Sequence, residues 1–372
     1  MKNKQKLKIL VDCHKFDEDL QGITTYLEGL YKELIKQEEI IFFLAANNLV
    51  NLEKVFGTAK NIKYVQLKFK NKWLRLLIDF PIIILKNKID FAHFQYVVPP
   101  IKFCKYITTI HDVLFLDYPS FFSKKYIFKN KLLFKFSAYL SDVVLTVSNY
   151  SKERLIENFN LHKTIFVTPN AVNEVYFQDY DKEKTRISIT RKFKISREYF
   201  ILVSRIEPRK NHLLLLKTYI ENKYFNDFDL VFVGKKDLDY EDLDLYLKNV
   251  DNFVKESIYF LDKVDNLELL DLVRGASLSI YPSFAEGFGI PPLETLAAKV
   301  PTVCSNKTAM RDFSFLKEYQ FNPNNPTELK EKIDQALAEY DFANSIKELK
   351  SAYNWQKSSN NYLEAIRFKT SN

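Results

Sequence analysis

The sequence has few of the residues that mark specialised protein classes. Its 372 residues include three cysteines, at positions 13, 104 and 304, without a C-x-x-C pair, so neither a disulfide framework nor a zinc site is indicated. No apolar run approaches the roughly 18 residues that a membrane-spanning helix needs, and the basic start lacks the apolar core of a signal peptide. We therefore expect a cytoplasmic protein.

Glycine is also scarce, and two of the seven glycines lie in S-F-A-E-G-F-G-I-P-P-L-E, residues 283–294. A chain poor in glycine keeps it mainly where a side chain would not fit. The segment follows a β-branched apolar run and precedes a helix-forming run, so it predicts free backbone N–H groups at a helix start. We expect an anionic ligand there, with Glu286 and Glu294 beside it to bind hydroxyl groups.

Apolar runs of strand length alternate with amphipathic segments almost throughout the chain, which is typical of parallel βαβ units. Hydrophobic content of 47% and charged content of 27% are ordinary for a globular protein. The charged segment at 179–196 lacks strand periodicity and suggests a domain boundary near 172–180. We predict an α/β protein with two doubly wound, Rossmann-like domains, 1–175 and 176–354, facing each other across a cleft.

The net charge of +8 is concentrated in the first half. Residues 1–175 carry 26 Lys and Arg against 17 Asp and Glu, whereas residues 176–372 carry 29 against 30. The first domain is therefore expected to meet something anionic.

The segment R-I-E-P-R-K-N, residues 205–211, follows a predicted strand and leads into a helix. Arg205 and Lys210 would then project near the helix amino end, where the dipole and the cations together favour phosphate. A charged, solvated loop is the alternative interpretation.

The spacing of Glu286 and Glu294 argues against a glycosidase pair. In a regular helix eight residues rise about 12 Å, more than the roughly 5–9.5 Å that hydrolysis uses. They are interpreted as two hydroxyl acceptors at different points of one long ligand. Alternatively, Glu294 is a first-turn acid that complements the helix dipole.

Other polar residues follow predicted strands in the basic half. His111, in T-T-I-H-D-V, directly follows a strand, and His93, in F-A-H-F-Q, is a weaker candidate of the same kind. Gly22 falls between the first strand and the first helix, where phosphates approach, although a plain turn also explains it. For His111 and His93 the alternative is a structural role, which is the more common one for a lone histidine.

Two segments of the first half interleave cations with large apolar residues, 68–88 and 121–136. Both fit contact with an anionic membrane surface, and both also fit amphipathic helices that pack on their own sheet. The packing interpretation is favoured for the first segment. No nucleic-acid-binding module is visible.

Taken in order, several motifs resemble the retaining GT-B-fold glycosyltransferases of family 4. The most specific is R-x-E-P-R-K-N followed about 80 residues later by P-S-x-x-E-G-F-G-I-P-P-L-E. Weaker matches are V-D-C-H, G-I-T-T-Y, T-I-H-D-V-L-F, L-T-V-S-N-Y-S, V-T-P-N-A-V-N, F-L-D-K-V-D-N-L-E-L-L and N-W-Q-K-S-S. The resemblance runs from Lys8 to about Phe368, and its E-P-R-K-N form is similar to mannosyl- and rhamnosyltransferases.

The resemblance implies a nucleotide sugar held mainly by the second domain and a glycan or lipid-linked acceptor held mainly by the first. By this resemblance Glu286, His111, Arg205 and Lys210 act at the donor sugar and its diphosphate. The residues expected to contact substrate are Gly22, Lys263, Val264, Phe288, Gly289, Ile290 and Glu294. The terminal helix, about 355–372, would pack back onto the first domain.

The resemblance further implies hexose transfer with retention, without metal or cofactor, in surface polysaccharide or glycoconjugate synthesis. No D-x-D triad appears in the relevant loop. Peripheral association with the inner face of a membrane would accompany a lipid-linked acceptor. The alternatives are a nucleotide-sugar epimerase or phosphorylase of the same fold, and a noncatalytic subunit that binds a glycan or lipid carrier.

The sequence departs from the family pattern at three places. Thr24 and Thr25 stand in G-I-T-T-Y where many relatives have G-I-G-R-Y, which makes phosphate or acceptor contact there less certain. Ala171 and Lys299 replace common glycines. None of these changes removes an expected phosphate or sugar ligand.

Overall fold

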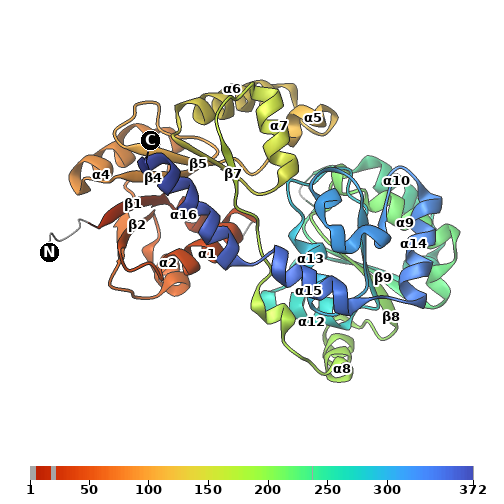
Figure 1. The fold of residues 1–372 in the computed structure, drawn as a ribbon. Helices are drawn as coiled ribbons and strands as arrows, with labels where there is room; N and C mark the ends of the chain where they lie inside the picture. The colour runs from red at the N-terminus through yellow and green to blue at the C-terminus, as the bar shows by residue number, and fades with distance from the viewer. Residues whose placement is uncertain (1–5, 18–21, 237, 372) are drawn as a thin grey trace. The chain divides into compact units, whose positions relative to one another are not determined.

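A computed structural model describes residues 6–17, 22–236 and 238–371 (Figure 1). The chain forms two compact units, one of Met1–Ala171 with Tyr353–Asn372 and the other of Val172–Ala352. Each unit is built on a parallel sheet flanked by helices. The predicted α/β class with two doubly wound domains is confirmed.

Unit 1 contains a seven-stranded sheet in the order β3-β2-β1-β4-β5-β6-β7, with parallel pairing throughout. Its strands are β1 (Leu7–Asp12), β2 (Ile40–Ala46), β3 (Ile62–Gln66), β4 (Phe91–Gln95), β5 (Lys105–Thr109), β6 (Val143–Thr146) and β7 (Ile165–Val167). A parallel sheet is covered on both faces, so its strands read as continuous apolar runs. Accordingly, Ile9, Leu10 and Val11 are all fully buried although they alternate between faces.

Several helices of unit 1 are capped at the amino end by polar side chains. They are α1 (Gly22–Leu34), α2 (Leu49–Phe56), α3 (Lys72–Leu74), α4 (Phe80–Asn87), α5 (Leu114–Asp117), α6 (Lys124–Leu140), α7 (Asn149–Phe159) and α16 (Trp355–Ser371), with a π-helical turn at Arg75–Asp79 and 3-10 turns at His14–Asp17 and Pro119–Phe121. The side chains of Asn48, Ser123 and Ser148 accept hydrogen bonds from the first turns of α2, α6 and α7.

The C-terminal helix α16 lies against α1 in unit 1 (Figure 1). A Cβ atom at Gly29 of α1 would come within 2.0 Å of the Trp355 ring, so only glycine permits this approach. α16 therefore completes the cover of the first sheet, although it is the last element of the chain.

Unit 2 contains a six-stranded sheet in the order β10-β9-β8-β11-β12-β13, also parallel. Its strands are β8 (Glu198–Val203), β9 (Phe228–Val233), β10 (Ile258–Leu261), β11 (Leu278–Tyr281), β12 (Thr302–Ser305) and β13 (Gln320–Phe321). Its helices are α8 (Lys182–Phe193), α9 (His212–Glu221), α10 (Glu241–Lys248), α11 (Asn252–Lys255), α12 (Asn266–Gly275), α13 (Ile290–Ala297), α14 (Pro326–Ala338) and α15 (Phe342–Ala352), with 3-10 turns at Glu174–Phe177, Pro208–Lys210, Tyr224–Asn226, Thr308–Asp312 and Ser314–Tyr319.

Each sheet has one point at which the order of its strands reverses. In unit 1 this point lies between β1 and β4, and in unit 2 it lies between β8 and β11. Doubly wound sheets bind ligands outside the carboxyl ends of the strands at such points. The fold therefore directs attention to the loops after β8 and β11, and to those after β1, β4 and β5.

Candidate active site

The loops after β8 and β11 are neighbours because these two strands pair, with Phe200 opposite Leu278 and Ile201 opposite Ser279. The backbone N–H of Phe284 donates to the carbonyl of Arg209 at 2.9 Å, which joins the loops directly. The Asn211 amide donates to the carbonyls of Pro282 (3.2 Å) and Pro323 (3.0 Å). The predicted phosphate loop and the predicted E-x7-E loop thus form one surface of unit 2.

Local backbone geometry explains the shape of both loops. Pro208–Lys210 forms a 3-10 turn that ends at Asn211, which has a left-handed φ of 58°. Asparagine tolerates this conformation better than most residues. In the second loop Gly289 has φ 100°, and a Cβ there would lie 3.1 Å from Met310 Cγ, so glycine is needed on both counts.

Glu286 lies at the centre of a partly enclosed ion cluster. Its Oε1 atom accepts hydrogen bonds from Lys210 Nζ at 2.5 Å and from Ser283 Oγ at 2.8 Å. Arg209 Nη1 lies 3.4 Å from its Oε2 atom. Arg209 also pairs with Glu207, so the cluster alternates acid and base across the two loops.

The surroundings of Glu286 keep its carboxylate ionised. Burial acts to raise the pKa of Glu286, but the charges of Lys210 and Arg209 and the hydrogen bonds from Lys210 and Ser283 outweigh it and lower the pKa to about 2. The Glu286 backbone is fixed as well, since its N–H donates to Thr308 Oγ1 at 2.8 Å. Glu286 is therefore a rigid, charged acceptor at neutral pH.

Arg205 has a different environment from Lys210. Its side chain is 60% exposed, and its guanidinium approaches Glu207 at 3.9 Å, too far for a hydrogen bond. It lies at the edge of the ion cluster, with most of its side chain open to solvent.

Glu294 is half-buried in α13 and, unlike Glu286, pairs with no cation among the described residues. Burial raises its pKa to about 7. The helix begins at Ile290, so Glu294 is the fifth residue and lies beyond the first turn. The expectation of a first-turn acid is therefore wrong, because the helix starts before its two prolines rather than after them.

The backbone donors expected at Phe288, Gly289 and Ile290 lie at the amino end of α13. Pro291 and Pro292 carry no N–H, so the N–H groups of this helix end come mainly from Phe288, Gly289 and Ile290. The Phe288 ring is buried against Phe313 in an edge-to-face contact, with the ring centroids 5.9 Å apart. The ring anchors the loop while the adjacent backbone stays at the helix end.

Lys263 and Val264 follow β10, which β9 separates from β8. Lys263 is exposed and Val264 is half-buried. They share the strand-end edge of the unit 2 sheet but do not bond to the ion cluster.

The remaining predicted residues belong to unit 1. His111 follows β5, and its Nε2–H donates to Gln95 Oε1 at 2.8 Å, while burial lowers the pKa of the ring to about 3. His93 is fully buried within β4. Gly22 begins α1, where an added Cβ would meet no described atom within 4 Å, so packing does not require glycine there.

Sequence reasoning missed Arg209, Glu207, Ser283 and Thr308. The first three lie within the two motifs and Thr308 lies in the turn after β12. The motifs alone do not say which of the adjacent Arg209 and Lys210 side chains turns toward Glu286. In the structure both do.

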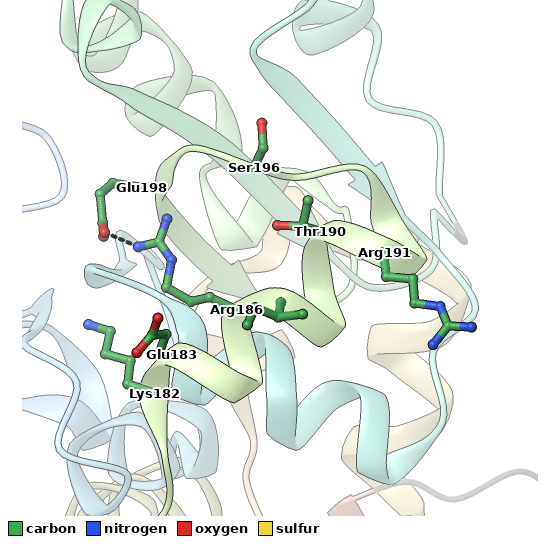
Figure 2. Close-up of a pocket in the computed structure, with 8 residues that line it drawn as sticks. Lys182, Glu183, Arg186, Thr190, Arg191, Ser196 and Glu198 are labelled. Carbon is green, nitrogen blue, oxygen red and sulfur yellow. Dashed lines mark hydrogen bonds and ion pairs between the residues drawn. The ribbon is translucent and has the colours of Figure 1, made fainter.

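A shallow hollow along α8 holds none of the predicted residues (Figure 2). Lys182, Arg186, Arg191 and Glu198 line it, and Arg186 pairs with Glu198 across it. It has the mixed charges of a solvated surface. Within the described ranges, the structure also contains no group of three or more His, Cys, Asp or Glu side chains that could hold a metal ion.

Comparison with known proteins agrees with the fold. The family model "Glycosyltransferase Family 4" matches residues 20–175, and "Glycosyl transferases group 1" matches residues 184–352. The chain is 32% identical over 202 residues to the O-antigen chain mannosyltransferase RfbU of Salmonella typhimurium, covering 53% of this chain and 51% of that protein. It is 30% identical over 210 residues to O-antigen chain mannosyltransferase B of Escherichia coli, covering 55% and 54%.

The chain thus spans about half the length of these curated relatives. Among solved structures, a glycosyltransferase from Rickettsia africae superposes over 99% of this chain and all of its own, with a TM-score of 0.72 and 20% identity. The two family models lie one in each half of the chain and leave only short segments unmatched. The chain belongs to the GT-B-fold glycosyltransferases of the family 4 type.

Proposed function

We propose that this protein transfers a hexose from a nucleotide-diphosphate sugar to a glycan or lipid-linked acceptor, with retention of configuration, in surface polysaccharide synthesis. The observation that carries the proposal is the contact of Lys210 and Arg209 with Glu286 across the two loops at the reversal point of unit 2. GDP-mannose is the first candidate donor, because the E-P-R-K-N motif and the two mannosyltransferase relatives favour it.

The charges of the cluster suggest how a diphosphate would be held. Lys210 and Arg209 are already balanced by Glu286 and Glu207. A bound diphosphate therefore needs further positive charge, which the exposed Arg205 and the amino end of α13 supply. Arg205 has only a long contact to give up, so redirecting its guanidinium costs little.

In the proposed reaction the leaving nucleoside diphosphate accumulates charge, which Arg205 and Lys210 stabilise. Losing one such preorganised donor typically costs about 2.7–4 kcal/mol of barrier. Glu286 accepts hydrogen bonds from the donor sugar and Glu294 from the ribose, while the departing phosphate oxygen takes the acceptor's proton on the same face. No metal or cofactor is assigned a role.

Unit 1 would receive the acceptor, and its surface chemistry suits an anionic membrane. Large apolar side chains on the turn before α4 and on α6 are exposed among lysines, including Leu77, Phe128 and Leu132. The basic segments 68–88 and 121–136 lie close enough to interact: burial lowers the pKa of Lys72 first, and the charge of Lys129 lowers it further. In the part of the chain that the structure describes, no helix has the length and apolar content to span a bilayer.

The test combines donor binding with product analysis. A donor that binds the folded state raises the unfolding temperature, so GDP-mannose, UDP-glucose and related nucleotide sugars are compared by thermal shift. We expect GDP-mannose to give the largest shift, and Lys210→Ala to abolish it.

The stabilising donor is then incubated with a glycan or polyprenyl-linked acceptor, with and without EDTA. An α-linked product from the α-linked donor, in equal yield with EDTA, supports the proposal. An epimerised free nucleotide sugar, phosphate-dependent glycan cleavage, or no nucleotide release with any donor would reject it.

A further inference from the structure

A buried row of polar side chains lies on one face of the sheet in unit 1. His93 and Gln95 are two residues apart on β4 and so share a face. Gln95 is paired in register with Thr109 of β5, and His111 follows two residues later. The strand period thus brings two histidines, an amide and a hydroxyl together at the carboxyl ends of β4 and β5.

These side chains form a continuous hydrogen-bonded chain. His111 Nε2 lies 2.8 Å from Gln95 Oε1, and Gln95 Nε2 lies 3.3 Å from His93 Nε2. His93 Nε2 also lies 2.8 Å from Thr109 Oγ1. Behind His93, its Nδ1 atom lies 2.6 Å from the Tyr31 hydroxyl, which is 3.0 Å from the hydroxyl of Tyr362 in α16.

The placement of the Gln95 amide sets the direction of the hydrogen-bonded chain. A carboxamide has one accepting and one donating end. With its oxygen at His111, Gln95 accepts the Nε2–H of that ring and donates to His93 Nε2. Burial lowers the pKa of His93 to about 3, so this ring is neutral, and its one proton is left on Nδ1 to donate to Tyr31.

His111 consequently presents a lone pair on Nδ1. Within the described residues this atom has no hydrogen-bond partner, and it is not among the fully enclosed unpaired atoms. The rings of Tyr26 and Tyr96 pack against the imidazole at centroid distances of 5.0 and 5.4 Å and hold it in place. A neutral nitrogen with a lone pair accepts from a hydroxyl group and repels a phosphate oxygen.

We propose that Gln95, supported by His93, is a positioning residue that fixes His111 as the Nε2–H tautomer, so that Nδ1 accepts a hydrogen bond from a sugar hydroxyl. The identity of the ligand rests on the proposed function, whereas the tautomer does not. Reversing the Gln95 amide would move the His111 proton to Nδ1 and replace the acceptor with a donor. The orientation of the Gln95 amide therefore decides whether His111 Nδ1 accepts a hydrogen bond from a ligand or donates one.

The experiment reads the tautomer directly. Protein labelled with ¹⁵N-histidine is examined by long-range ¹H–¹⁵N correlation spectroscopy, and the five histidines are assigned by substitution. We expect wild-type His111 to be protonated only at Nε2. Gln95→Ala should give averaged nitrogen shifts of mixed tautomers, while Gln95→Glu, which keeps an accepting oxygen, should preserve the Nε2–H form.

Asn61→Ala is the matched control. Asn61 is another buried amide of unit 1, and it donates to the carbonyls of Ile35, Gln37 and Ile40, away from this network. Loss of the Asn61 amide should lower the unfolding temperature without changing the tautomer of His111. Wild-type protonation at Nδ1, an unchanged single tautomer in Gln95→Ala, or a shift of His111 in Asn61→Ala would overturn the proposal.

An activity measurement separates positioning from stability. Gln95→Ala should lower kcat/KM of sugar transfer between about twofold and tenfold, the range of one net hydrogen bond. In a His111→Ala background the same substitution should have no further effect. Additive losses would contradict the positioning role, and absence of transfer in the wild type would reject the proposed function but leave the tautomer result standing.

Discussion

At the scale of single residues, Arg209 joins the two loops of the candidate site. It contacts Glu286 and pairs with Glu207, and it donates to the Ala285 carbonyl. Removing it leaves two buried carboxylates short of a cation, and breaking a buried pair in this way costs about 3–5 kcal/mol. We expect Arg209→Ala to lower the free energy of unfolding at pH 7 by an amount near the lower end of that range, since other partners remain.

The loss of unfolding free energy in Arg209→Ala should depend on pH. The folded pKa of Glu286, about 2, is below its unfolded value, so its contribution to stability is present above the unfolded pKa and is lost as the pH falls toward 2. Urea unfolding at pH 7, 5 and 3 should therefore show the difference between wild type and Arg209→Ala shrinking on acidification. A difference in stability that does not change with pH would mean that Arg209 acts by packing alone. The stability of Arg209→Lys should lie between that of the wild type and that of Arg209→Ala.

Glu294 should behave in the opposite sense. Its folded pKa, about 7, is raised above the unfolded value, so the protonated form stabilises the fold at low pH and this stability is lost as the pH rises toward 7. Glu294→Gln should be neutral at pH 4 and should stabilise the ligand-free protein by about 1–2 kcal/mol at pH 8, while weakening donor binding. Urea unfolding at both pH values tests this, with the exposed Glu331→Gln as a control that should change neither.

The sequence indicated the two motifs but not every contact within them. Spacing and proline placement identified the loops at 205–211 and 283–294, and Lys210 and Glu286 lie in contact. The sequence could not show that Arg209 turns inward while Arg205 stays exposed. These directions are set by the left-handed backbone of Asn211 and by the hydrogen bonds from its amide to the carbonyls of Pro282 and Pro323. Lys299, at a usual glycine position, has φ 58°, which accounts for the glycine of relatives.

At the scale of elements, α6 is the clearest candidate for membrane contact. Phe128 and Leu132 are one turn apart and are 71% and 55% exposed, with lysines around them. Replacing both with serine should reduce sedimentation with phosphatidylglycerol vesicles severalfold, because their apolar area no longer enters the interface. Leu245→Ser on α10, which removes a leucine that is 62% exposed, is the matched control and should leave vesicle binding unchanged. Equal vesicle binding by all variants would reject the role of α6.

Elements differed in how well their pattern predicted them. Long apolar runs identified the strands of both sheets, whereas β13, of two residues, is too short to have a detectable period. Conversely, the charged segment at 179–196 contains α8, whose helical character is weakly patterned because only Thr185 and Ile189 are buried. Tertiary contacts, rather than local sequence, define such elements.

At the scale of the whole molecule, unit 1 is built from two distant parts of the chain. Gly29→Ala tests how they join, because a methyl group there overlaps the Trp355 ring. We expect net destabilisation of about 1–3 kcal/mol despite the better helix propensity of alanine, and a red shift of Trp355 emission measured in a Trp73→Phe background. Gly22→Ala, in the same helix but with no neighbour within 4 Å, should not destabilise the protein. Identical unfolding temperatures for the two variants would contradict this packing.

This arrangement also has a consequence for biosynthesis. Residues 172–352 leave the ribosome before α16 does, and at 5–20 residues per second that interval is on the order of ten seconds or more. Until then the nascent first sheet lacks the helix that carries Trp355 and Tyr362, and the Tyr31 hydroxyl lacks one of its two partners, since it also bonds to His93. The second unit is therefore free to mature first, and Tyr362 can join the Tyr31 end of the buried histidine network only once translation has passed residue 362.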